Sequence, residues 1–417
     1  MLTKFYYSTM KGAPNLASEW GSLLSVLKGC LLNGFNEQQV SSVAIANGIA
    51  TITLGSDHGF IENQVVSVSG ANEALFNTEY RVLSVAATNI TVKAPDIESV
   101  TGSILIKTAS MGWTEKFTGT NKSVFAAKDT TKNRFVLRVD NSLPTGYDTS
   151  WAKFARVTIA ENMIDIDNFG SFAKAPTAPN NINTNEQGNG VTGASGAYGW
   201  AKWYHGIETI PFLKEQSTAG QSPSLEWEIV GDDSCFYLWV KITNSDGRAT
   251  YAFTTIDAFS SIDSFNCFLS ATDGLRAANA NGEFDSTGRN SANCQWKSLD
   301  TSGKFILRNY TGIGNTHEPC GLFSLNVGNS QQVSGRSESL PFPNRPDNGV
   351  ILHDVYVKTD NGIRGTLPCV KWINNRWVFG SFGNKYVLSK QEGKYLVLGA
   401  GYHNEGMTSF FAFELRG

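Results

Sequence analysis

The stretch VGDDSCFYLWV, residues 230–240, decides the fold that we expect for this chain. Successive side chains of a β-strand point to opposite faces, so Phe236 and Leu238 share one face. Tyr237 and Trp239 occupy the other face. Large apolar side chains on both faces predict a strand that the protein's own core covers on both sides. We therefore expect this strand to lie between hairpin-paired neighbours in a β-sandwich.

Similar strand patterns flank this stretch on both sides. SLEWEIVG precedes it, RATYAFTTI follows it, and the polar NSDG before the latter is typical of a hairpin loop. Short strands that recur about every 8 to 12 residues between turn signals favour two packed antiparallel sheets. The expected fold class is mainly β, with a short N-terminal helix, a small β-barrel or β-sandwich module and a larger antiparallel β-sandwich region.

Three regions follow from these patterns. Residues 1–40 are expected to form an N-terminal helical docking segment, residues 41–108 a small all-β module, and residues 109–417 a β-sandwich domain. In the second region, VAIANGIATITL places Asn-Gly between two alternating runs, which is the strongest short hairpin signal. If the last region is divided further, we expect the boundary near residues 270–300.

The N-terminal segment contains the strongest helix pattern of the chain. Asn15 can cap a helix over about residues 16–32, and Asn33 with Gly34 would end it. This helix either packs on its own domain or docks a partner or a neighbouring subunit, and the pattern leaves both open. One apolar face supplies the candidate interface residues Leu16, Trp20, Leu23, Leu24 and Leu27.

Composition and charge exclude some classes of partner. Charged residues make up only 17% of the 417 residues, aromatic residues make up 12%, and the net charge is −3. No basic cluster is present, so we expect no nucleic-acid partner. No apolar run approaches the ~18 residues that a membrane helix needs, so we expect no membrane insertion. The first residues lack the apolar core of a secretory signal.

The cysteines do not predict a disulfide framework or a metal site. The six cysteines include no C-x-x-C pair, and a large chain without a signal favours free, buried thiols. His317 and Cys320 form one H-x-x-C pair, but nothing at metal-site spacing completes it. We expect no metal and no cofactor.

Two patterns are candidate sites. Glu226 and Glu228 share a strand face and could form the carboxylate pair of a glycosidase. Such pairs are common on solvated faces, so we expect no catalytic residues and no enzyme. The aromatic run YGWAKWYHG follows a long polar loop, and its rings suit either core packing or the binding of a glycan or partner. The candidate binding residues are Tyr198, Trp200, Trp203 and Tyr204.

Several stretches resemble structural proteins of the virions of tailed bacteriophages. These are GWTEKFTGTNKSVFAAKD, RFVLRVDN and LEWEIVGDDSCFYLWV, and the start FYYSTMKGAPNL followed by VLKGCLLNGF is similar to the same tail- and neck-associated group. The resemblance covers roughly the first 255 residues. It implies a structural role, with no cofactor and no active site to carry over.

The resemblance and the composition together give the expected function. We expect a virion component of the tail, tail tip or neck, assembled in the bacterial host cytoplasm. It would form rings with copies of itself and dock to neighbouring virion proteins. The alternative is a receptor- or glycan-binding module of a fibre or spike, for which a host surface glycan would be the partner. A polysaccharide-degrading enzyme and a capsid decoration protein rank below it.

Overall fold

The structure is a computed structural model. It describes residues 2–144, 147–170, 201–206, 224–241, 248–271, 305–308, 317–323, 351–374, 386–390, 393–400 and 409–417. Within these ranges antiparallel sheets dominate and helices are short, which confirms the mainly β fold class. None of the helices in the described ranges is long and apolar enough to cross a membrane.

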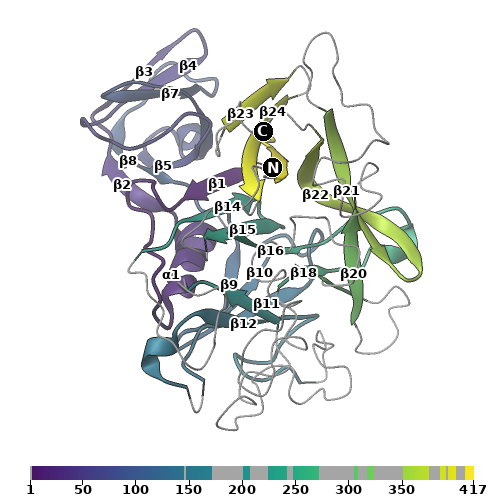
Figure 1. Cartoon of the computed structure of the whole chain (residues 1–417). Helices are drawn as coiled ribbons and strands as arrows, with labels where there is room; N and C mark the ends of the chain where they lie inside the picture. Colours follow the sequence, from purple (N-terminus) through teal and green to yellow (C-terminus); the bar gives the residue numbers. More distant parts are fainter. Residues whose placement is uncertain are drawn as a thin grey trace.

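The largest sheet contains thirteen antiparallel strands from the N-terminal, middle and C-terminal parts of the chain (Figure 1). Its short β17 (Asp257–Ala258) pairs with β22 beside the main path. Along that path the strands are β1 (Lys4–Tyr7), β14 (Trp227–Gly231), β15 (Phe236–Lys241), β16 (Arg248–Thr254), β18 (Phe268–Ser270), β19 (Phe305–Arg308), β20 (His317–Phe323), β21 (Ile351–Thr359), β22 (Gly362–Asn374), β25 (Ser409–Glu414), β24 (Gly393–Ala400) and β23 (Tyr386–Lys390).

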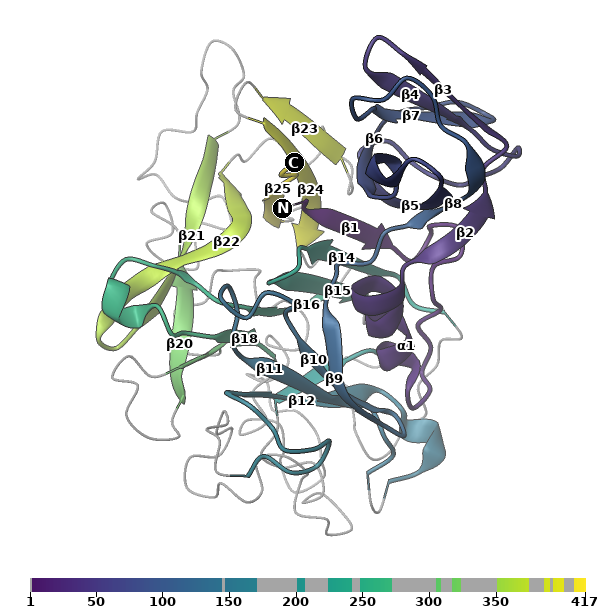
Figure 2. The ribbon, with the colours of Figure 1, turned by 180° about the vertical axis from the view of Figure 1, so that it is seen from behind.

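A second sheet of five strands packs against the middle of the first. The ring of Trp203 stacks on that of Tyr251 with 5.6 Å between centroids, and it meets Phe236 edge-on at 5.9 Å. In Figures 1 and 2, β14 to β16 lie between this second sheet and the C-terminal strands. The five strands, in pairing order, are β13 (Ala201–Tyr204), β12 (Phe154–Ala160), β11 (Val136–Asp140), β10 (Lys122–Ala126) and β9 (Thr114–Gly119).

Strand β15 is buried on both faces, as the alternation of its side chains predicts. Phe236 packs against Trp113, 5.5 Å between centroids, on the side of the five-stranded sheet. On the opposite side, the rings of Tyr237 and Trp239 each lie 5.2 Å from that of Phe413 in β25. The second face of this strand is therefore covered by the protein's own C-terminal strands.

A third sheet of seven strands has its own apolar core. Its outermost strands are consecutive in the sequence, because β2 ends at Gln39 and β3 begins at Ser42. A link this short brings the two edges of the sheet close together, so the sheet curls on itself. The first strand begins at residue 35, before the boundary expected at residue 41. The strands are β2 (Phe35–Gln39), β8 (Gly102–Thr108), β5 (Val65–Ala71), β6 (Glu79–Val85), β7 (Asn89–Lys93), β4 (Ile49–Thr53) and β3 (Ser42–Ala46).

The N-terminal helix is shorter than the sequence pattern predicts. Helix α1 spans Ser22–Lys28 and continues as a π-helical turn, η1, over Gly29–Asn33. The start expected at Asn15 is wrong, because Gly21 adopts φ 90° and interrupts the helical path. At this φ other residues are strained, and a Cβ at Gly21 would also lie 2.2 Å from the side chain of Asn121, so the position favours glycine. Strand β1, which the pattern did not predict, precedes the helix and pairs with β14.

Candidate functional site

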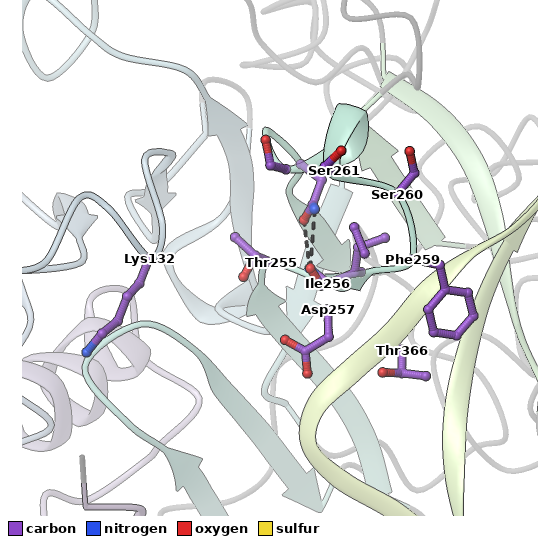
Figure 3. A pocket seen from close by; sticks show the side chains of 11 residues that line it. Lys132, Thr255, Ile256, Asp257, Phe259, Ser260, Ser261 and Thr366 are labelled. Atoms are coloured by element: carbon purple, nitrogen blue, oxygen red, sulfur yellow. Dashed lines mark hydrogen bonds between the residues drawn. The ribbon is translucent and has the colours of Figure 1, made fainter.

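An open pocket of about 570 Å³ lies beside β17 and β22 (Figure 3). It is formed mainly by the segment that follows β16. Phe259 and Thr366 lie on one side of the pocket in the close-up, and Lys132 approaches from the other. Hydroxyl groups dominate the polar lining, contributed by Thr255, Ser260, Ser261, Ser264 and Thr366.

The backbone of this pocket is held by side-chain hydrogen bonds. The amide oxygen of Asn266 accepts from the N–H of Ile256 at 2.7 Å, and its NH₂ donates to the carbonyl of Asp263 at 2.6 Å. Asp257 is held by its antiparallel pairing with Thr366. A short 3₁₀ turn, η6 (Ser261–Asp263), closes the segment. The pocket is therefore formed before any ligand arrives.

The described lining of the pocket contains few charged side chains, and they have both signs. Partial burial raises the pKa of Asp257, and the nearby carboxylates of Asp354 and Asp232 raise it further. The cations of Arg416 and Lys371 lower this pKa but do not cancel the rise. Lys132 lies 3.4 Å from a carboxylate oxygen of Asp233. Among the described residues, the lining contains one carboxylate, Asp257, and a glycosidase needs two. Hydroxyls, one amide and one aromatic ring suit the binding of a neutral polar ligand.

Three exposed large apolar side chains lie on the segments that form this pocket, and one of them, Phe259, lines it. Phe259 is 63% exposed, Ile262 is 77% exposed and Ile363 is 51% exposed. We call these three the rim patch. The N–H of Phe259 donates to the carbonyl of Arg364 at 2.9 Å, which brings the two segments together.

A buried ion pair links the two segments that carry the rim patch. The guanidinium of Arg364 donates to both carboxylate oxygens of Asp263, with 2.7 Å from Nε to Oδ2. Both side chains are buried. The ion pair therefore connects the two backbone segments that carry Ile262 and Ile363.

The apolar face of the N-terminal helix is not an exposed interface. Four of its predicted residues are buried in the main core, and Trp20 is partly buried with its ring edge-on to Phe154 at 5.7 Å. The alternative that the helix packs on its own domain is what the structure shows. The prediction that these side chains dock a partner is wrong for this conformation, because the core already covers Leu16, Leu23, Leu24 and Leu27.

The four candidate binding residues of the aromatic run at residues 198–206 fall into two groups. Tyr198 and Trp200 lie outside the described residues. Trp203 and Tyr204 belong to β13 and are fully buried, and the indole N–H of Trp203 donates to the carbonyl of Ser270 at 3.0 Å. These two rings are core residues, so they cannot contact a glycan in this structure.

The two members of the candidate carboxylate pair lie in different surroundings. Glu228 is buried, whereas Glu226 is exposed and lies 3.4 Å from the ammonium of Lys241. Neither residue lines the pocket.

One set of metal-ligating side chains in the described ranges was not predicted. Asp232, Cys235 and Cys369 bring one oxygen and two sulfur atoms within 4.8 Å of one another. The quoted stretch contains the first two as D-x-x-C, but the third lies 134 residues after Cys235. Spacing along the chain could not have revealed it. The five cysteines in the described ranges are free and buried.

Comparisons with known proteins give little further information. No model of a protein family and no curated protein matches the chain. Among solved structures, the chain is similar at 12% identity and a TM-score of 0.16 to a chain described as phage phi92 endosialidase. The alignment covers 91% of this chain and 52% of that one, so the chain spans about half the length of that protein. A TM-score this low does not establish a shared fold.

Proposed function

We propose that this protein is a structural component of a tailed-phage virion, at the tail, tail tip or neck. It acts by assembling with copies of itself and docking to neighbouring virion proteins. Three of the stretches that resemble the phage group form strands of the two packed sheets: β9 and β10, β11, and β14 and β15. Almost all residues of β11, β14 and β15 are buried, so these strands support the framework more than they offer surface for contacts between copies.

Two separate exposed apolar patches carry this proposal. The first is the rim patch beside β17. The second, which we call the module patch, consists of Leu83 and Val85 on β6, which are 40% and 41% exposed. The seven-stranded module and the β21–β22 hairpin lie at opposite sides of the molecule in Figures 1 and 2. Two different patches on opposite sides are what a closed ring of identical subunits requires, because each subunit contacts its two neighbours differently.

The proposal can be tested with two double variants. Phe259→Ser with Ile262→Ser removes the rim patch, and Leu83→Thr with Val85→Thr removes the module patch. We expect each double variant to remain a monomer in light scattering at concentrations where the unmodified chain associates. Mixing the two should produce dimers that cannot grow, because only one intact patch of each kind remains.

The outcomes separate the alternatives. Ile164→Ser is a matched control, because Ile164 is 57% exposed and belongs to neither patch. A self-complementary contact would instead leave one of the two double variants dimeric by itself, before mixing. An unmodified chain that stays monomeric, together with an intact virion whose density by electron cryomicroscopy has no place for this chain, would overturn the proposal.

A second candidate function is the binding of a glycan receptor, which the hydroxyl-rich pocket with Phe259 at its edge favours. Asp257→Asn and Thr366→Val alter the lining with little change in volume. We expect them to weaken binding on a glycan array without altering association between copies. Unchanged glycan binding in both variants would exclude the pocket.

A further inference from the structure

The turn between β14 and β15 and the middle of β22 bring two thiols and a carboxylate together in the core. The Sγ atoms of Cys235 and Cys369 are 4.0 Å apart. Asp232 Oδ1 lies 3.5 Å from the sulfur of Cys235, and its Oδ2 lies 3.7 Å from that of Cys369. All three side chains are buried.

We propose that Asp232, Cys235 and Cys369 form a binding site for a divalent metal ion of the zinc class. In a tetrahedral site, metal–sulfur distances of about 2.3 Å and metal–oxygen distances of about 2.0 Å place neighbouring ligand atoms roughly 3.5 to 3.8 Å apart. The sulfur–oxygen separations, 3.5 Å to Oδ1 and 3.7 Å to Oδ2 of Asp232, fall in that range, and the 4.0 Å between the two sulfur atoms lies just above it. Two thiolates with one carboxylate favour zinc over hard cations such as magnesium or calcium.

The turn holds the carboxylate of Asp232 in a fixed orientation. Its Oδ1 accepts hydrogen bonds from the backbone N–H and the hydroxyl of Ser234, both at 2.8 Å, and from the N–H of Cys235 at 3.1 Å. The other oxygen, Oδ2, points to Cys369. Hydrogen bonds of this kind orient the ligands of metal sites. A Cβ at Gly231 would lie 2.2 Å from the carbonyl of Cys235, so the tight turn requires glycine.

Cys369 lies in a stretch of β22, between Thr366 and Lys371, where the pairing with β21 is irregular. This residue adopts φ 63°, a conformation that L-residues other than asparagine and aspartate rarely occupy. Such strain persists only where the surrounding structure imposes it, and it gathers at functional sites. Here it accompanies a thiol directed toward Cys235 and Asp232.

The surroundings match the charge of an occupied site. Two thiolates and one carboxylate around a divalent cation leave a net charge of −1. The guanidinium of Arg416 lies within electrostatic range of both cysteines and can balance it. The three residues leave one position of a tetrahedral ion for a water molecule or another donor.

The site joins two strands that are far apart in the sheet. Strands β15 and β22 are separated by β16 and β18 to β21 along the pairing order, yet their residues meet here. A bound ion would therefore hold the curved sheet together. It would also fix β22 close to the pocket, because Thr366 in the pocket lining precedes Cys369 by three residues.

The test measures metal in the purified full chain. We expect about one zinc-class ion per chain by mass spectrometry. Replacement with Co²⁺ should give the thiolate-to-cobalt absorption and the visible bands of a tetrahedral site. Cys235→Ser and Cys369→Ser should lose both signals. Cys267→Ser is the matched control, since Cys267 is another buried thiol that lies outside the cluster.

A conservative variant keeps the test decisive if the serine variants fail to fold. Asp232→Asn retains the oxygen that accepts from Ser234 and Cys235 but loses the charge, so the turn should persist. We expect it to weaken Co²⁺ binding at least about tenfold, with an unchanged far-ultraviolet circular dichroism spectrum. Folded, unmodified chain that binds neither Zn²⁺ nor Co²⁺ after reduction, or that carries a Cys235–Cys369 disulfide in place of metal, overturns the proposal.

Discussion

The side-chain oxygen of Asn141 accepts a hydrogen bond from the backbone N–H of Leu23 at 3.1 Å, across 118 residues of sequence. It also accepts from the N–H of Gly21 at 3.0 Å, and its NH₂ donates to the carbonyl of Phe154 at 3.0 Å. Asn141 follows β11 in the five-stranded sheet. A residue of that sheet therefore caps helix α1, which has no side-chain cap of its own.

Replacing Asn141 by alanine should lower the free energy of unfolding by about 2 to 4 kcal/mol, because a cap is lost and buried polar groups lose their partner. Denaturation with urea measures this change. The control is Asn72→Ala, which removes an exposed hydrogen bond to Thr101 and should cost less than about 0.5 kcal/mol. Equal losses in both variants would contradict the capping role.

His205 should make stability depend on pH in a mildly acidic range. Burial lowers the pKa of His205 to about 4, from an ordinary value of 6.5. Between these values the unfolded chain binds the proton and the folded chain does not, so stability falls as pH falls from 6.5 to 4. The loss is at most about 3 kcal/mol.

Urea midpoints between pH 4 and 8 test this dependence, and His205→Gln should flatten it. Burial alone would raise the pKa of Asp140, but Arg156 and Arg138 outweigh that effect and hold it below its ordinary value of 3.8. Its contribution is therefore lost only at lower pH, as the carboxylate becomes protonated. Identical profiles for the variant and the unmodified chain would show that His205 is not the group responsible.

The stability losses from mutating Arg364 and Asp263 should not be additive. Removing either partner leaves a buried charge uncompensated and should cost about 3 to 5 kcal/mol. Replacing both by leucine should cost less than the sum of the single changes. Chemical denaturation of the four proteins of this double-mutant cycle gives the coupling, and strictly additive losses would contradict it.

Replacing Trp203 should lower the stability of the protein far more than replacing Phe259. Trp203→Ala removes a buried ring that stacks on Tyr251 and should lower the free energy of unfolding by about 3 to 5 kcal/mol. Phe259→Ala removes an exposed ring and should cost less than about 1 kcal/mol. Thermal unfolding separates the two, and a small effect at Trp203 would restore it as a candidate binding residue.

The fold class could be predicted because burial in a strand follows a local alternation. Phe236 and Tyr237 occupy opposite buried faces as expected. The hairpin at Asn47 and Gly48 is also confirmed, with φ of 52° and 73° between β3 and β4. These features depend on neighbouring residues, which the sequence shows directly.

Features that depend on distant residues could not be predicted. The short helix results from Gly21 lying against Asn121, and its cap comes from Asn141. Whether Trp203 serves as core or as a binding surface depends on the strand that covers it. The partner of Cys235 is known only once β22 has been placed.

Strand β1 has a consequence for the order in which the protein can fold during synthesis. Lys4 pairs with Gly231, and the N–H of Thr3 donates to the carbonyl of Arg416 at 3.2 Å. The seven-stranded module can form from residues 35–108 alone, but β1 has no partner until β14 has been translated. At about 5 to 20 residues per second that delay is on the order of 10 to 45 seconds. During this time KFYY presents a strand without its partner, and such an exposed edge can pair with other chains and promote aggregation.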